Sequence, residues 1–192
     1  MNKPLFLFCG RSASGKTTIA NMLAEQYGYQ QIESYTTRKP RFDGERGHVF
    51  VNEEEFNNLG ELAAYTYYNN CHYGTTFDQL DEADVYVVDV PGIESLLKKL
   101  KYDKRPIGIL YFKTSAYNRI LRMMERGDSN QMIIDRLLQD EKDDWLKQLD
   151  SLVWKYANIF GKDVALYNIN ANGNLDNVLS LVLYYMKRYE EV

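Results

Sequence analysis

Short apolar runs alternate with amphipathic stretches along most of this chain. The runs are rich in β-branched and aromatic residues and have the length of strands covered on both faces; they are Leu5 to Cys9, Val85 to Val90, Ile107 to Phe112 and Val164 to Ile169. A helical pattern follows the first run from Gly15 to Tyr27 and stops at Gly28. This alternation predicts an α/β fold with a parallel central sheet.

The C-terminal part of the chain carries two further helical patterns. Apolar residues recur at helical spacing between Ser129 and Phe160, a stretch long enough for one bent helix or two, and Gly161 ends it. A last amphipathic helix is expected from about Leu175 to Tyr189.

The region from 34 to 83 breaks the alternation. It opens with a basic loop, Asn52 and Glu55 have the spacing of a capping box, and Leu62 to Tyr68 forms an aromatic strand pattern. Because no repeat or Pro/Gly linker separates this region, we expect it to be a lobe inserted into a single domain of residues 1–192.

Composition narrows the class of protein. A chain of 192 residues with 45% apolar content can bury one sizeable core, and a net charge of −4 argues against a general nucleic-acid partner. There is no charged-then-apolar leader and no apolar run of about 18 residues, so a cytoplasmic protein without a membrane partner is expected. Cys9 and Cys71 show neither disulfide nor metal-ligand spacing.

A phosphate-binding motif joins the first strand to the first helix. Residues 10 to 17 match the Walker A pattern G-x-x-x-x-G-K-[ST]. In such a loop the glycines allow a tight turn, and backbone N–H groups point at the phosphates of a nucleoside triphosphate. Lys16 would reach the β- and γ-phosphates, and Thr17 would ligate Mg²⁺. The residues predicted to bind the cofactor are Gly10, Ser12, Ala13, Ser14, Gly15, Lys16, Thr17 and Thr18. The alternative is a strand–turn–helix corner that happens to be rich in glycine and serine.

Two arginine clusters have the chemistry of phosphate binding. Arg38 and Arg41 flank Pro40, which stiffens the loop that presents their planar guanidinium groups. Arg122 and Arg126 stand four residues apart on a helical pattern, and a break at 127–129 precedes Arg136. The alternatives are a solvated basic turn and a helix surface laced with salt bridges.

At the segment Ser34-Tyr35-Thr36-Thr37-Arg38-Lys39-Pro40-Arg41 the chain resembles guanylate kinase, whose acceptor-binding segment reads S-x-T-T-R-x-P-R. Further matches follow in family order along nearly the whole chain: Phe50 to Phe56, Tyr73-Gly74-Thr75, Asp89 with Gly92, and Arg119 to Arg136. The resemblance implies a three-layer P-loop NTPase fold, with core segments 1–33, 84–118 and 139–192, an acceptor-binding lobe of mixed α/β structure at 34–83, and a helical lid at 119–138.

The resemblance also implies an activity and its residues. It implies transfer of the γ-phosphoryl group of ATP, with Mg²⁺, to GMP, dGMP or a related nucleotide by a monomer or homodimer. The catalytic residues that it implies are Lys16, Arg38, Arg122, Arg126 and Arg136. The acceptor-binding residues that it implies are Ser34, Arg38, Arg41, His48, Tyr73, Thr75 and Asp89.

Three departures from the family pattern bear on specificity. Ala64 stands where counting back from Tyr73 places the first guanine-reading acid, which leaves the base of the acceptor open. The loop 42–48 is two residues shorter than usual and brings His48 to the place of a phosphate-binding tyrosine. Val87 replaces a further acid, so Mg²⁺ would depend on Thr17, phosphates and water.

Other functions are compatible with parts of the sequence. Val88 to Gly92 matches the D-x-x-G motif of small GTPases, although the chain contains no N-K-x-D motif. A non-catalytic binding module would typically lack the phosphate-loop lysine, which is present here as Lys16. A kinase for another nucleotide or for a phosphorylated sugar remains open.

Overall fold

Two β-sheets organise the chain in the computed structural model, which describes residues 3–41, 43–141 and 144–190. The central sheet is parallel and has the strand order β6-β1-β7-β8. Its strands are β1 (Leu5–Cys9), β6 (Val85–Val87), β7 (Ile107–Lys113) and β8 (Val164–Asn170). All five residues of β1 are buried, as expected for a strand covered on both faces.

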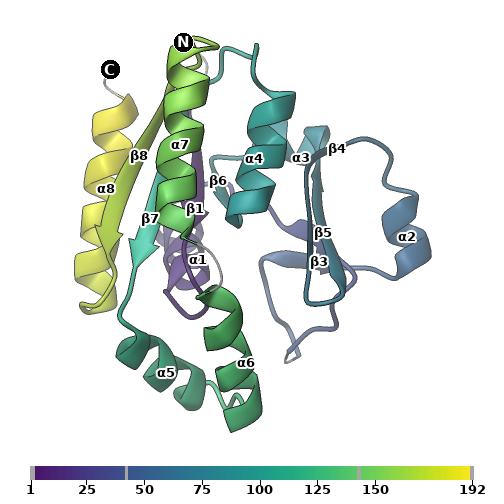
Figure 1. The fold of residues 1–192 in the computed structure, drawn as a ribbon, viewed down its shortest axis with the longest axis vertical. Helices are drawn as coiled ribbons and strands as arrows, with labels where there is room; N and C mark the ends of the chain where they lie inside the picture. Colours follow the sequence, from purple (N-terminus) through teal and green to yellow (C-terminus); the bar gives the residue numbers. More distant parts are fainter. Residues whose placement is uncertain (1–2, 42, 142–143, 191–192) are drawn as a thin grey trace.

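Helices cover both faces of the central sheet (Figure 1). On one face α1 (Lys16–Tyr27) and α8 (Leu175–Glu190) contribute buried side chains that pack with Phe6 and Phe8. On the other face α4 (Val90–Lys99) and α7 (Trp145–Asn158) pack with Leu5 and Leu7. The predicted three-layer α/β architecture is confirmed.

A second, mixed sheet forms within residues 34–83 and has the order β3-β2-β5-β4. Its strands are β2 (Ser34–Thr36), β3 (His48–Phe50), β4 (Leu62–Tyr68) and β5 (Cys71–Thr76), and two short helices, α2 (Glu53–Asn57) and α3 (Phe77–Glu82), belong to the same region. Asn69 and Asn70 connect β4 to β5 with φ of 48° and 56°, the left-handed values that a two-residue hairpin turn requires. The capping box of Asn52 and Glu55 is present at α2.

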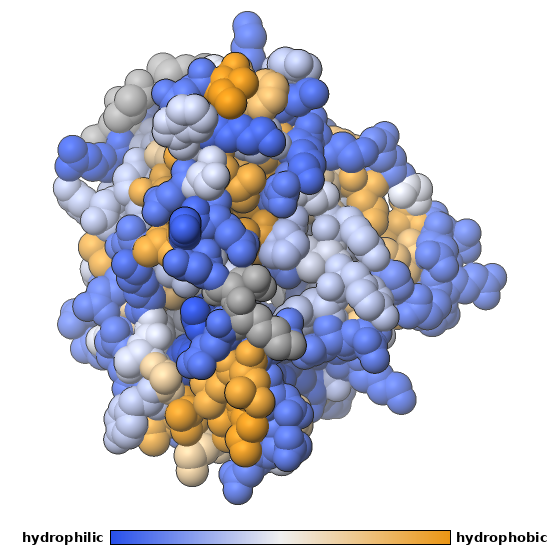
Figure 2. Space-filling model, in the orientation of Figure 1, coloured by the Kyte–Doolittle hydropathy of each residue, from blue (hydrophilic) through white to orange (hydrophobic). Residues whose placement is uncertain are grey.

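The segment predicted as a lid forms two helices, α5 (Ala116–Glu125) and α6 (Asn130–Asp140), which extend beyond the sheet in Figure 1. Gly127 turns the chain between them with φ of 83°, and Ser129 caps α6 by accepting the Met132 N–H at 3.3 Å. Apolar side chains gather at this end of the molecule (Figure 2). They include Leu121, Met124, Met132, Ile134 and Leu138, which are exposed. No helix in the described part of the chain is long and apolar enough to cross a membrane.

One predicted element needs correction, and one open alternative is decided. The expected strand Val85 to Val90 ends at Val87, because Asp89 caps α4 by accepting the Gly92 N–H at 2.9 Å, and Pro91 then lies in the first turn, where its missing N–H costs nothing. The pattern from Ser129 to Phe160 forms two helices, α6 and α7, and the junction at 142–143 lies outside the described residues.

The buried face of α4 offers a test of this packing. Leu96 is fully buried against the central sheet, whereas Leu138 on α6 is 61% exposed. Leu96→Ala should lower the free energy of unfolding by about 2–5 kcal/mol, through lost apolar burial and the cavity left behind. Leu138→Ala, the same chemical change at an exposed site, should change it by about 0.5 kcal/mol or less. Equal effects in denaturant titrations would contradict the packing described here.

Candidate functional site

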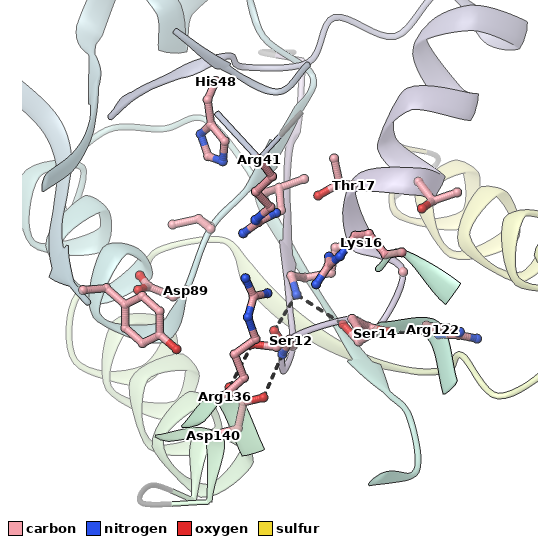
Figure 3. A pocket seen from close by; sticks show the side chains of 18 of the residues that line it. Ser12, Ser14, Lys16, Thr17, Arg41, His48, Asp89, Arg122, Arg136 and Asp140 are labelled. Atoms are coloured by element: carbon pink, nitrogen blue, oxygen red, sulfur yellow. Dashed lines mark hydrogen bonds between the residues drawn. The ribbon is translucent and has the colours of Figure 1, made fainter. Parts of the chain in front are cut away.

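A cavity of about 630 Å³ lies where the central sheet, the second sheet and the two lid helices meet (Figure 3). All eight residues predicted to bind the cofactor line it: Gly10, Ser12, Ala13, Ser14, Gly15, Lys16, Thr17 and Thr18. Residues of other elements that were predicted from the sequence to act in the site also line it: Ser34, Arg41, His48, Tyr73, Asp89, Arg122, Arg126 and Arg136.

The loop between β1 and α1 has the backbone that its glycines allow. Gly10 has φ of 149°, and a Cβ there would lie 2.7 Å from the Phe112 carbonyl oxygen, so a larger residue would clash with β7. Gly15 has φ of 96° at the N-cap of α1. Ala13 has a left-handed φ of 58° although it is not a glycine, a strained conformation that the surrounding contacts must hold.

Lys16 folds back over this loop. Its Nζ donates to the Gly10 carbonyl at 2.6 Å, to the Arg11 carbonyl at 3.0 Å and to Ser14 Oγ at 3.2 Å. Burial lowers the pKa of Lys16, while nearby groups including Asp140 and Asp89 act in the opposite direction. The ammonium group is therefore held at the loop by dipoles that a phosphate oxygen could replace.

Glu45 joins Arg38 and Arg41. Its Oε1 accepts from Arg38 at 2.9 Å and from Arg41 at 3.2 Å, and its Oε2 accepts the Arg41 backbone N–H at 2.7 Å. Burial and then the neighbouring Arg38 lower the pKa of Arg41 to about 10. Burial acts to raise the pKa of Glu45, but hydrogen bonds from both arginine residues hold it below its usual range. Arg41 lines the cavity, whereas the Arg38 guanidinium lies over the Phe50 ring at 5.2 Å.

Asp128 joins two of the lid arginines in the same way. Arg126 Nε donates to it at 3.0 Å, and the Arg136 guanidinium lies 3.7 Å from its carboxylate. Arg122 instead supports the phosphate loop, since its guanidinium donates to the Ala13 carbonyl at 3.3 Å and to the Ala171 carbonyl at 2.7 Å. Arg122 and Arg126, which we expected on one helix face, therefore have different partners: Arg122 contacts the phosphate loop, and Arg126 contacts Asp128.

On the side of the second sheet, polar groups face the cavity from β2, β3 and the start of α4. Ser34 Oγ and His48 Nδ1 lie 3.0 Å apart, and the His48 ring packs edge-on against Tyr73. Burial, followed by the charge of Arg38, lowers the pKa of His48 to about 4, so this imidazole is neutral near pH 7. Asp89 accepts from Thr66 Oγ1 at 2.8 Å, and burial raises its pKa.

Besides Arg38, two positions named from the sequence do not line the cavity. Thr75 is fully buried, does not line the cavity and donates to Gln79 Oε1 at 2.9 Å. Ala64 is 1% exposed and packs in the apolar core. On strand β4 the side chain that faces the cavity is Thr66, two residues on, followed by Tyr68. The alternation of a strand could have found Thr66, because 64, 66 and 68 share one face.

Within the described ranges, no group of three or more His, Cys, Asp or Glu side chains could hold a metal ion. Thr17 lines the cavity next to Lys16, and Asp89 faces the same space. This set fits a Mg²⁺ ion carried by nucleotide phosphates better than a cation held by protein ligands alone.

Comparison with known proteins shows the family. No protein-family model matches the chain. The guanylate kinase of Helicobacter pylori strain 26695 is 31% identical over 166 residues, which is 78% of each chain. The chain belongs to the guanylate kinase family. A guanylate kinase of Chlamydia caviae is 32% identical over 140 residues, and a crystal structure of guanylate kinase from Anaplasma phagocytophilum has a TM-score of 0.54 at 15% identity, covering 97% of this chain and 86% of that one.

Membership of this family establishes the fold of the chain but not its activity. The chain spans 66% of the length of the guanylate kinases of Chlamydia felis and Bartonella quintana, which are 27% and 29% identical to it. The solved structure shares the fold at low identity. What this family member binds and transfers must therefore be argued from the cavity.

The buried neutral His48 predicts a pH dependence of stability. Between its ordinary pKa of 6.5 and the folded value of about 4, the unfolded chain binds a proton that the folded chain does not. Stability should therefore fall as pH falls through this range. His48→Gln lacks this proton, so its free energy of unfolding should decline less between pH 7 and pH 4.5 than that of the wild type. Parallel profiles in urea titrations would contradict a neutral, buried His48.

Proposed function

We propose that this member of the guanylate kinase family transfers the γ-phosphoryl group of ATP to the phosphate of GMP, dGMP or a related nucleoside monophosphate. The observation that carries the proposal is the convergence of a complete phosphate loop, Arg41, Arg126 and Arg136 on one cavity. Phosphoryl transfer needs little covalent chemistry from the protein. Its catalysis consists of positioning two phosphates in line and stabilising the charge between them.

The donor phosphates would occupy the loop between β1 and α1. Its backbone N–H groups and the N-terminus of α1 provide fixed positive dipoles, and Lys16 would exchange its carbonyl partners for phosphate oxygens. Thr17 and the phosphates would hold Mg²⁺, which would neutralise charge on the β- and γ-phosphates. Arg122, already bonded to the loop carbonyl of Ala13, would border this donor site.

The acceptor phosphate would lie near Arg41, which lines the cavity from the loop between β2 and β3. A dianion there would compete with Glu45 for the guanidinium groups of Arg41 and Arg38. His48, neutral and bonded through Nδ1 to Ser34, can present Nε2–H as a donor to the same anion. Arg126 and Arg136 of the lid would then bind the phosphoryl group in transfer, as Asp128 releases them.

The polar groups near Asp89 favour a base edge that carries N–H donors. Thr66 gives its single hydroxyl proton to Asp89, so towards a ligand it offers acceptor lone pairs only. Asp89, when ionised, is also an acceptor. Together they complement the N1–H and N2–H groups of guanine, and Thr66 supplies an acceptor although Ala64 lies in the core.

Three other functions are less well supported. The mechanism of a small GTPase does not explain why arginine residues from the second sheet and the lid converge on the cavity. A non-catalytic binding module does not require the phosphoryl-transfer residues, yet Lys16, Arg126 and Arg136 all line the cavity. A sugar-phosphate kinase would not need the acceptor pair Thr66 and Asp89.

Lys16→Ala tests the donor site. Loss of this charge from the place where negative charge gathers should lower kcat for GMP phosphorylation on the order of 10²- to 10⁴-fold, as measured by coupled ADP release. Lys98→Ala removes a lysine that is 61% exposed on α4 and should retain wild-type turnover. Near wild-type kcat in the Lys16 variant would rule out this cavity as the active site.

Arg41→Lys tests the acceptor site with the charge retained. An ammonium group cannot reproduce the guanidinium fork, so KM for GMP should rise about tenfold while KM for ATP stays within twofold. Arg46→Lys, the same change in the same loop at a side chain that is 69% exposed, should alter neither constant. An equal rise in both KM values would show that Arg41 does not act on the acceptor.

A further inference from the structure

A buried ion pair joins the two lid helices at their base. Arg119 of α5 and Asp140, the last residue of α6, lie 2.6 Å apart between guanidinium Nη1 and carboxylate Oδ2. Their side chains are 3% and 2% exposed. Neither residue belongs to the arginine clusters that the sequence analysis singled out, and Asp140 also lines the cavity.

The same carboxylate reaches the phosphate loop. Asp140 Oδ2 accepts the Ser12 backbone N–H at 2.9 Å, and Oδ1 lies 3.4 Å from Ser12 Oγ. Figure 3 shows Asp140 pointing from the base of the lid towards Ser12. A loop whose N–H groups serve to bind phosphate thus has one of them committed to a carboxylate of its own chain.

Ser12 immediately precedes the strained position of the loop. Ala13 holds its left-handed φ of 58° between contacts on both sides: Asp140 fixes the N–H of Ser12, and Arg122 fixes the carbonyl of Ala13 at 3.3 Å. Thr114 adds a third contact, to the Ser14 carbonyl at 3.3 Å. A strained backbone persists only where its surroundings determine it, and Asp140 is one of these determinants.

The geometry of the ion pair does not favour a purely stabilising role. Arg119 Nε is buried without a hydrogen-bond partner among the described residues. A buried pair that leaves a donor unsatisfied is a weak stabiliser and can often be replaced by apolar residues without loss. This points to the hydrogen bond from Ser12 as the feature that the pair supports.

We propose that Asp140 is a positioning residue for the donor nucleotide: its carboxylate, neutralised by Arg119, holds the Ser12 N–H and so fixes the phosphate loop in its binding conformation at the hinge of the lid. The proposal rests on the proposed function in taking ATP as the ligand of this loop. It assigns Arg119 a supporting role, as the cation that makes a buried carboxylate tolerable beside the site.

Two double variants separate the hydrogen bond from the ion pair. Arg119→Leu/Asp140→Asn removes both charges and keeps an oxygen that can accept the Ser12 N–H, whereas Arg119→Leu/Asp140→Leu removes the charges and the acceptor. Dissociation constants for ATP with Mg²⁺ and for GMP are measured separately by calorimetry, so the readout does not require turnover. Thermal unfolding reports on the folded state of each variant.

The Asn double variant should bind ATP within about threefold of the wild type, and the Leu double variant should bind it about tenfold or more weakly. Both should bind GMP with wild-type affinity. Equal ATP affinities in the two double variants would overturn the proposal and would show that the Arg119–Asp140 pair has only a structural role. A wild type that binds ATP but phosphorylates no acceptor would overturn the proposed function instead, and the ATP comparison would still decide the role of Asp140.

Hydrogen exchange in the ligand-free wild type gives an answer even if a double variant does not fold. The Ser12 amide, bonded to a buried carboxylate, should exchange slowly. Exchange at the rate of an open loop would overturn the proposal.

Discussion

The concentration of positive charge around one cavity is the constraint on which this structure depends. If these guanidinium groups bind phosphates, as we propose, they must stay in place when no phosphate is present, although they repel one another. The charge of Arg38, for example, contributes to the lowered pKa of Arg41. The chain meets this constraint with its own carboxylates. Glu45 bonds Arg38 and Arg41, Asp128 bonds Arg126 and Arg136, and Asp140 bonds Arg119.

These carboxylates differ in what a ligand would do to them. Arg41, held by Glu45, and Arg126 and Arg136, held by Asp128, line the cavity, so under the proposed function a phosphate would replace each carboxylate as their partner. Asp140 holds an arginine that is 2% exposed and, at the same time, a backbone N–H of the phosphate loop. Under the proposed function, Glu45 and Asp128 would take part in binding and releasing phosphate, whereas Asp140 would belong to the fixed geometry of the donor site.

The same need to limit positive charge explains why His48 is neutral. A protonated imidazole beside Arg38 would add another cation to the cluster, and burial lowers its pKa to about 4. The neutral ring can still donate one hydrogen bond while Ser34 satisfies the other nitrogen. Under the proposed function, His48 would thus give the site a hydrogen-bond donor for phosphate without a charge that would need a further carboxylate.

Local patterns in the sequence predicted the parts of the molecule that depend on local physics. The tight turn between β1 and α1, the capping box of α2, the break at Gly127 and the layered sheet all follow from spacing and turn residues, and the structure confirms them. The strand at Val85 was predicted too long because capping by Asp89 overrides the apolar run.

Contacts between residues far apart in the sequence could not be predicted in this way. Ala64 was aligned with a guanine-reading acid, but it lies in the apolar core, and Thr66 on the same strand lines the cavity instead, because the packing of β4 against the rest of the molecule decides which part of the strand reaches the cavity. Asp140 meets Ser12 across 128 positions, and no motif marks either residue as part of such a contact.

The central claim is that one cavity binds a donor and an acceptor nucleotide with their phosphates in line. An analogue that joins adenosine and guanosine through five phosphates spans both sites and tests this claim most directly. Calorimetry should give a dissociation constant at least about 100-fold below that of ATP alone, because the second nucleotide binds within the same molecule and adopts the geometry of transfer. An analogue that binds no more tightly than ATP would contradict the account.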